Sequence, residues 1–342
     1  MTSPVWQVLR PGALTTVQDQ GRHGVRHLGV GRAGALDPAL AAVANRLVGN
    51  VADAAVLELT LAGPTLALPR PARIALCGAE VAARFEDGNG HSSSLPGGRP
   101  LRLPAGTLHL GRLRGGLRAW LAVAGGIDVP VVLGSRSTDL RGGFGGLHGR
   151  ALRAGDVLPI GTSPVDEASP QIAHVAVHAA HTNLQVPGWW VDPYFDTPQD
   201  APIRYLPAPW ATDATTVPAV LDGHTWTVDP RSDRQGLRCA GESLGITGAE
   251  QLSAAVAPGT LQLPPDGCPL VLLADAQTVG GYPRLGHVLA ADLPRLAQLR
   301  AGDALRFMAV TPAEADAVRR ERAARMARLE WMIDLAREGI AA

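Results

Sequence analysis

Glycine and proline are unusually frequent in this chain, which has 40 glycines and 28 prolines among 342 residues. Both residues interrupt regular structure, glycine through its conformational freedom and proline through its missing N–H. Yet 46% of the residues are hydrophobic, which is far more than a disordered chain contains. The combination predicts a mainly β fold in which many short strands are joined by tight turns.

Hydrophobic runs bounded by turn residues predict the individual elements. Asp37 followed by Pro38 has the form of a helix start, and Gly49 has the form of a helix end, so a helix is expected between them. Thr311 and Glu314 have the spacing of a capping box before a long arginine-rich segment. Strands are expected at 6–9, 15–18, 56–61, 65–68, 74–77, 81–85, 108–110, 118–124, 172–178 and 203–207, and further helices at 292–299 and 312–337.

One turn phrase occurs in both halves of the chain, as LRAGDVL at 152–158 and LRAGDAL at 299–305. Its Gly-Asp pair is typical of a turn that leads into a strand. The repetition indicates two similar β modules. We therefore expect a first module at 1–165, a connector at 166–202, a second module at 203–310 and a C-terminal amphipathic helix at 311–342.

The chain contains no lysine, since all 31 of its basic residues are arginine. This excludes a Walker-A nucleotide loop, Schiff-base chemistry with pyridoxal phosphate, and a protein kinase. It also excludes covalently carried biotin. Any phosphate or carboxylate must be held by arginine, by backbone N–H groups or by neutral polar side chains. The net charge of zero argues against binding to nucleic acid.

Cys77, Cys239 and Cys268 are odd in number and widely spaced, which predicts buried thiols in a protein of the reducing cytoplasm. No apolar run is long enough to suggest a signal peptide or a membrane span. His174 and His178 share one face of an expected strand, but no carboxylate completes a metal-ligand spacing. We therefore expect no metal site.

Four polar motifs occur in order along the chain: TTVQDQGRHG at 15–24, GGIDVPVVLGSRST at 125–138, SDRQG at 232–236 and ADAQTVGGYP at 274–283. Together they resemble the biotin-dependent carboxyltransferase family, also called the allophanate hydrolase subunit 2 family. The resemblance runs from about Val8 to Val310 and implies two cyclophilin-like β-barrel modules. One departure is Val279, which replaces the usual second threonine of the last motif.

Family members act on amide-like groups, and the chain most resembles the C subunits of 5-oxoprolinases. The resemblance implies ATP-dependent opening of the 5-oxoproline lactam to glutamate, with partners that resemble the B and A subunits of that enzyme. ATP, alone or with Mg²⁺, is the expected cosubstrate. One alternative is a carboxyltransferase that acts on a urea-like nitrogen with biotin supplied in trans. Another is a non-enzymatic role as the regulatory partner of a kinase-inhibitor protein.

Several motif residues have side chains suited to holding an anion. The guanidinium of Arg136 can bind a carboxylate or phosphate through two parallel hydrogen bonds, or it can tie its own loop together. Arg234, next to Asp233, has the same two possibilities. The full set of candidate substrate- or anion-binding residues is Ser135, Arg136, Ser137, Thr138, Asp233, Arg234, Gln262, Gly280 and Gly281.

Other motif residues suit catalysis. Asp19 and Arg22 flank a glycine and form either an acid/base pair or an internal salt bridge. Asp275 is a candidate general base or, as often before a turn, a hydrogen-bond acceptor. Gln277 precedes two glycines that let backbone approach a ligand closely. The candidate catalytic residues are Asp19, Arg22, Asp275, Gln277, Thr278 and Tyr282.

Overall fold

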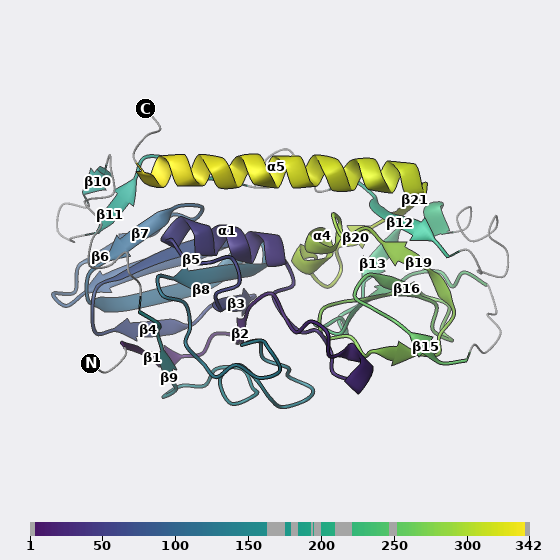
Figure 1. The fold of residues 1–342 in the computed structure, drawn as a ribbon, viewed down its shortest axis with the longest axis horizontal. Helices are drawn as coiled ribbons and strands as arrows, with labels where there is room; N and C mark the ends of the chain where they lie inside the picture. The colour runs from purple at the N-terminus through teal and green to yellow at the C-terminus, as the bar shows by residue number, and fades with distance from the viewer. Residues whose placement is uncertain are drawn as a thin grey trace. The chain divides into compact units, whose positions relative to one another are not determined.

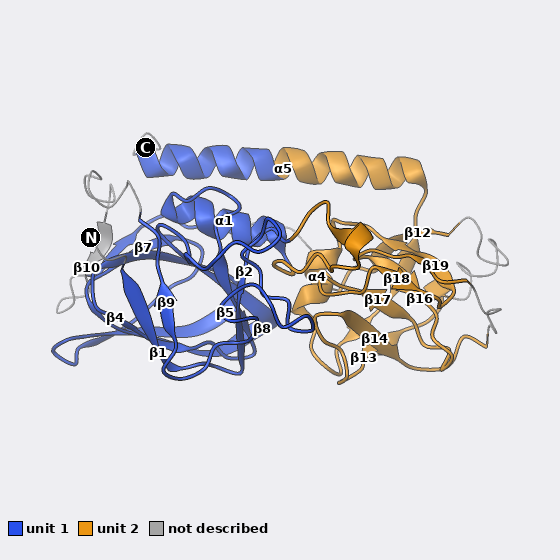
Figure 2. Cartoon of the chain, turned by 60° about the horizontal axis from the view of Figure 1, so that its bottom comes forward, with its two compact units in different colours: residues 1–21, 37–195, 326–342 blue, residues 22–36, 196–325 orange. Residues whose placement is uncertain are grey.

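A computed structural model describes residues 4–162, 175–178, 184–192, 194, 200–208, 221–245 and 252–338. The chain forms two compact units, which Figure 2 distinguishes by colour. Unit 1 contains residues 1–21, 37–195 and 326–342, and unit 2 contains residues 22–36 and 196–325. These bounds differ from the predicted modules, because residues 22–36 belong to unit 2 and the last helix is shared between the units.

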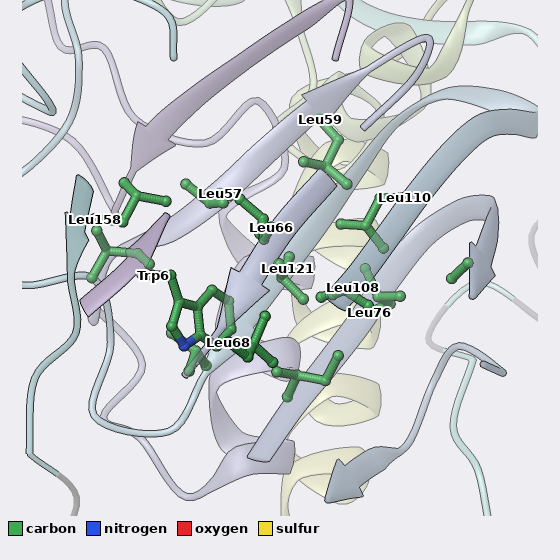
Figure 3. Packing of buried hydrophobic residues seen from close by; sticks show 14 of the residues in the cluster. Trp6, Leu57, Leu59, Leu66, Leu68, Leu76, Leu108, Leu110, Leu121 and Leu158 are labelled. Atoms are coloured by element: carbon green, nitrogen blue, oxygen red, sulfur yellow. The ribbon is translucent and has the colours of Figure 1, made fainter. Parts of the chain in front are cut away.

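Unit 1 is built on one large, nearly closed sheet, in agreement with the predicted mainly β fold. Figure 3 shows its interior, where leucines from several strands pack with Trp6. The path of the sheet runs β10-β11-β7-β5-β8-β4-β1-β9, and β2, β3 and β6 pair off this path. Its strands are β1 Val5–Arg10, β2 Leu14–Gln18, β3 Val56–Thr60, β4 Thr65–Leu68, β5 Ala72–Asp87, β6 Ser92–Ser94, β7 Pro100–Leu103, β8 Gly106–Val123, β9 Val157–Pro159, β10 Val175–His178 and β11 Gln185–Pro187.

Strands β5 and β8 are longer than the sequence pattern predicts. The runs 74–77 and 81–85 are parts of the single strand β5, and the runs 108–110 and 118–124 fall largely within β8. The register of the pair shifts between Gly78 and Glu80. Gly78 has a φ of 109°, and a Cβ there would lie 2.7 Å from the Arg118 carbonyl oxygen. A glycine inside the predicted pattern therefore marks a bulge in a continuous strand rather than its end.

Helix α1, Pro38–Val48, begins and ends where the sequence predicts. The Leu40 N–H donates to Asp37 Oδ1 over 3.0 Å, which caps the first turn. Gly49 ends the helix in a left-handed conformation with a φ of 85°. The helix is buried through Leu40, Val43 and other apolar side chains.

Unit 2 contains a second, smaller sheet of order β20-β13-β14-β17-β16-β19-β12-β21 and the separate pair β15-β18. The short helix α4, Leu293–Gln298, confirms the helix predicted at 292–299. The strands are β12 Ile203–Pro207, β13 Trp226–Val228, β14 Gly236–Ala240, β15 Ala254–Ala255, β16 Thr260–Gln262, β17 Leu270–Leu272, β18 Val279–Gly280, β19 Arg284–Val288, β20 Ala304–Leu305 and β21 Phe307–Ala309.

The repeated turn phrase has the same hydrogen bonds in both units. In unit 1 the Val8 N–H donates to the Asp156 carbonyl over 2.8 Å, and in unit 2 the Val228 N–H donates to the Asp303 carbonyl over 2.9 Å. The side-chain carboxylates of Asp156 and Asp303 each accept the backbone N–H of the residue three positions earlier, Arg153 or Arg300, over 2.7 Å. The glycines before them have φ values of 87° and 88°. The predicted repeat is therefore confirmed at the level of a single turn.

Helix α5, Pro312–Glu338, is the long helix at the C-terminal end of the fold in Figure 1. The Thr311 N–H donates to Glu314 Oε2 over 2.8 Å, as the predicted capping box requires. In unit 1, Arg46 of α1 donates to Asp334 Oδ1 over 3.0 Å and to Glu330 Oε2 over 3.3 Å. Within the described part of the chain, no helix is both long and apolar enough to cross a membrane.

Candidate functional site

In unit 1 the first two motifs meet around the carboxylate of Asp19, which lies just after β2 and is buried. Asp19 Oδ1 accepts the hydroxyls of Ser135 and Ser137 over 2.6 and 2.5 Å. It also accepts the Gly21 N–H over 2.8 Å, and Oδ2 accepts the Arg136 N–H over 2.5 Å. Because four donors hold this carboxylate, its clearest role is to fix the 135–138 loop against β2.

The predicted anion-binding loop uses most of its donors within unit 1. Arg136 Nε donates to the Val129 carbonyl over 2.9 Å, and Nη2 donates to Asp128 Oδ1 over 3.1 Å. Thr138 Oγ1 donates to the Val17 carbonyl over 3.0 Å. The geometry therefore favours the alternative in which Arg136 ties its own loop together, although its side chain remains 37% exposed.

In unit 2, Arg234 and Asp275 form a buried bidentate ion pair. Arg234 Nε lies 2.9 Å from Asp275 Oδ2, and Nη2 lies 3.0 Å from Oδ1. Nη2 also donates to the Gly34 carbonyl over 2.6 Å. The neighbouring Asp233 is exposed, and its Oδ1 accepts the Gln235 N–H over 2.8 Å in a tight turn. These partners suit a pair that holds three segments of unit 2 together better than a free general base.

A third group of motif residues lies around Gln262, at the end of β16. Gln262 is fully buried, and its Nε2 donates weakly to the Tyr282 carbonyl over 3.5 Å. Its Oε1 is buried and accepts no hydrogen bond from the described residues. A Cβ at Gly280 would lie 3.0 Å from Gln262 Nε2, which is a tight contact, and 3.6 Å from Gln277 Nε2, so both side-chain amides lie close to the Gly280 backbone.

The other residues of the last motif lie in the same segment as Gln277 and Gly280. The Thr278 carbonyl accepts the Val256 N–H over 3.0 Å beside the pair β15-β18. Gly281 is half-buried, and the Tyr282 side chain is 44% exposed. The structure thus brings together the residues of the last motif and adds the buried Gln262 from another strand.

Sequence reasoning missed Arg26, which starts the short 3-10 helix η1, Arg26–Leu28. Its Nη2 donates to the Val256 carbonyl and, over 3.4 Å, to the Gln277 carbonyl, so it joins the Gln262 group. Burial lowers the pKa of Arg26, and burial together with the charge of Arg26 lowers the pKa of Arg32. The one available signal was the concentration of arginines at Arg22, Arg26 and Arg32, but nothing in the sequence shows that residues 22–36 belong to unit 2.

Arg22 is buried, and its backbone N–H donates to the backbone carbonyl of Arg32 over 2.7 Å, within unit 2. Asp19 belongs to unit 1, so the predicted pairing of Asp19 with Arg22 stays a prediction.

The thiols of Cys77 and Cys239 are buried, as expected, and Cys268 is half-buried. Burial raises the pKa of Cys77 to about 12 and also raises the pKa of Cys239. His174 lies outside the described residues, as does His181. The described residues contain no group of three or more His, Cys, Asp or Glu side chains that could hold a metal ion.

Comparison with known proteins identifies the family. The family model for the carboxyltransferase domain, subdomain A and B, matches residues 28–309. The chain belongs to this carboxyltransferase-domain family. The match begins after β1, β2 and Arg26 and ends before helix α5, so most of the sheet of unit 1, the whole sheet of unit 2 and Gln262 lie within the matched range.

Two curated relatives match along nearly their whole length. The chain is 38% identical to the 5-oxoprolinase C subunit of Escherichia coli, over 96% of this chain and 98% of that protein. It is 31% identical to the 5-oxoprolinase C subunit of Haemophilus influenzae, over 93% and 96%. The solved structure of Kluyveromyces lactis urea carboxylase is 26% identical with a TM-score of 0.78, covering 95% of this chain but only 29% of that chain.

Proposed function

We propose that this chain is the C subunit of an ATP-dependent 5-oxoprolinase. The observation that carries the proposal is the match to the C subunit of E. coli 5-oxoprolinase, which covers 98% of that protein at 38% identity. The match to the urea amidolyase of Lachancea kluyveri, by contrast, covers only 17% of that longer protein. In this proposal the lactam C–N bond of 5-oxoproline is cleaved by water, and ATP hydrolysis drives the reaction.

The residues around Gln262 suit the recognition of an amide-like substrate. An amide oxygen that gains negative charge needs aligned donors, and an amide N–H needs an acceptor. Gln277 and Thr278 carry donors beside the glycine backbone, and Gln262 Oε1 is an acceptor in a buried setting. We assign substrate binding and orientation to these residues.

In the proposal, the lactam oxygen takes the γ-phosphoryl group of ATP and ADP leaves. Water then adds to the activated carbon, the ring C–N bond breaks to leave an acyl phosphate, and a second water releases phosphate and glutamate. Without lysine, this chain could hold phosphates through arginines, backbone N–H groups and neutral polar side chains. In the proposal, A-like and B-like partner proteins therefore supply a large share of the nucleotide site and of the hydrolytic step. We place the complex in the cytoplasm, where ATP is available and the three free cysteines would stay reduced.

The experiment is reconstitution from separately purified proteins. The chain is mixed with its A-like and B-like partners, and glutamate release from 5-oxoproline is measured with and without ATP. We expect release that requires ATP and all three proteins. If the folded proteins in all combinations release no glutamate, the proposal is wrong.

The similarity to urea carboxylase supports a second candidate, carboxyl transfer from biotin to a urea-like nitrogen. Since this chain cannot carry biotin on a lysine, the biotin would come from another protein. The two functions differ in their requirements, because carboxyl transfer needs bicarbonate and is blocked by avidin. Activity that is insensitive to avidin and independent of bicarbonate would leave only the first candidate.

A further inference from the structure

Arg26 has a hydrogen-bonding capacity that the described structure does not use. Its Nη2 is engaged by the Val256 and Gln277 carbonyls, but its Nη1 is buried and donates to no acceptor among the described residues. A guanidinium carries five N–H donors, and one left unmet away from water costs free energy. The fold therefore maintains a buried donor that an incoming acceptor would satisfy.

Gln262 presents the complementary group. It is fully buried, its Nε2 faces the Tyr282 carbonyl over 3.5 Å, and its Oε1 accepts nothing from the described residues. The orientation of the amide follows from this contact, since turning it over would set Oε1 against a carbonyl oxygen. The contact between Nε2 and the Tyr282 carbonyl fixes the amide and leaves Oε1 as an acceptor that the described residues do not use.

The two unused groups belong to one cluster. Arg26 donates to the carbonyl of Val256, and the side chain of Val256 lies 3.5 Å from the position of a Cβ at Gly280. That same position is 3.0 Å from Gln262 Nε2. Val256 therefore meets the guanidinium through its carbonyl and lies beside Gly280 and the Gln262 amide through its side chain. We call these residues, Arg26, Val256, Gln262, Gln277 and Gly280, the Arg26–Gln262 cluster.

Among the described residues, the positive charge of Arg26 also lacks a counter-charge. Arg26 forms no ion pair with an acidic side chain in the described ranges, while Arg32 is close enough for the two positive charges to disfavour each other. Burial lowers the pKa of both guanidinium groups. Placing an oxyanion at Arg26 would offset both the burial and the repulsion.

We propose that Arg26 and Gln262 form a binding site for a small molecule that carries an oxyanion beside an amide N–H. The guanidinium binds the oxyanion, and Gln262 Oε1 accepts the amide hydrogen. The inference rests on the proposed function and adds the mode of recognition to it. The carboxylate of 5-oxoproline is attached to the carbon next to the ring nitrogen, so this substrate presents both groups together.

Binding to the full-length chain tests the site directly. Isothermal titration calorimetry is done with three probes: 5-oxoproline, 2-pyrrolidinone, which keeps the lactam but lacks the carboxylate, and ATP. We expect 5-oxoproline to bind at least about 10-fold more tightly than 2-pyrrolidinone, because one charge-assisted contact is lost. Failure of the wild-type chain to bind 5-oxoproline would overturn the proposal.

Substitutions then assign the contacts. Arg26→Lys should weaken 5-oxoproline binding about 10-fold or more and leave 2-pyrrolidinone unchanged, since a point charge cannot replace the planar fork. Gln262→Glu should weaken 5-oxoproline binding more than 2-pyrrolidinone binding, because it places a second negative charge beside the carboxylate that only 5-oxoproline carries. The matched control is Arg231→Lys, which changes an exposed arginine of the same unit and should change nothing.

The Gly280→Ala variant tests the same site independently, because the added Cβ would lie 3.0 Å from Gln262 Nε2 and would displace the amide. We expect this variant to weaken 5-oxoproline binding while its unfolding transition stays cooperative. Unchanged 5-oxoproline affinity in folded Arg26→Lys and Gln262→Glu proteins would contradict the inference. So would an Arg26→Lys effect confined to ATP, which would assign the guanidinium to a nucleotide phosphate.

The test separates this inference from the proposed function. If the reconstituted complex releases glutamate but Arg26→Lys leaves its KM for 5-oxoproline unchanged, the site is wrong and the function stands. If the complex is inactive while the chain binds 5-oxoproline through Arg26 and Gln262, the function is wrong and the site stands.

Discussion

A buried carboxylate is stable in a protein only while its hydrogen-bond partners remain in place. Asp19 accepts two hydroxyls and two backbone N–H groups, and every one of these partners is a donor. The Asp19→Asn substitution replaces one acceptor oxygen by an NH₂ group that faces donors. We expect a loss of about 1–3 kcal/mol in the free energy of unfolding, measured by urea denaturation. Asp128→Asn, at an exposed partner of Arg136, is the control, and an equal loss in both variants would contradict this account.

The buried pair of Arg234 and Asp275 should behave differently from an exposed pair. Asp275→Asn leaves a buried guanidinium without its counter-charge, so we expect about 3–5 kcal/mol of destabilisation. Arg231→Lys alters the exposed pair with Asp229, where water screens the charges and we expect no resolvable change in stability. Urea denaturation of the two variants measures the difference. If Asp275 is instead a free general base, Asp275→Asn would abolish turnover with unfolding unchanged.

The bulge in β5 depends on a single glycine. Gly78 has a φ of 109°, and a Cβ would meet the Arg118 carbonyl at 2.7 Å. Gly90 also has a positive φ, 82°, but a Cβ there meets nothing within 4 Å. We expect Gly90→Ala to cost about 1 kcal/mol through backbone strain alone, and Gly78→Ala to cost clearly more. Thermal unfolding measures both, and equal costs would mean that the strand accommodates the clash.

The repeated turn gives unit 1 a defined response to acid. The Arg150 guanidinium, followed by the Arg153 N–H, holds the pKa of Asp156 below its usual value. Because the native pKa lies below the unfolded pKa, this stabilisation is present at neutral pH and is lost as the pH falls below about 4. The stability difference between wild type and Asp156→Asn should therefore shrink from pH 7 to pH 3 in urea titrations. A difference that grows on acidification would contradict the assignment.

At the level of elements, the sequence correctly predicted the helices whose ends are marked by capping residues. Asp37, Pro38 and Gly49 mark helix α1 correctly, and the capping box of Thr311 marks helix α5. The pattern failed where a glycine interrupts hydrophobicity without ending a strand, as at Gly78. Hydrophobic periodicity describes one segment at a time, whereas the continuity of β5 depends on its pairing with β8.

At the level of the whole molecule, the motifs were sufficient to place Gln277, Gly280 and Tyr282 in one loop. They could not show that residues 22–36 belong to unit 2, because this depends on contacts such as the Ala33 N–H with the Ala274 carbonyl at 3.1 Å. Arg26 was missed for that reason. The sequence contained a second sign of the two-module repeat, because the pattern Trp-x-Val occurs at Trp6–Val8 and again at Trp226–Val228. Both tryptophans are buried in the structure.

The central claim is that this chain supplies the 5-oxoproline-binding residues of an ATP-dependent 5-oxoprolinase. The most direct measurement is the release of glutamate and phosphate by the reconstituted complex, with wild-type chain, with Arg26→Lys chain, and with this chain omitted. We predict equal amounts of both products with wild type, at least about a 10-fold higher KM for 5-oxoproline with Arg26→Lys, and no glutamate without the chain. Undiminished glutamate release when the chain is omitted would contradict the claim.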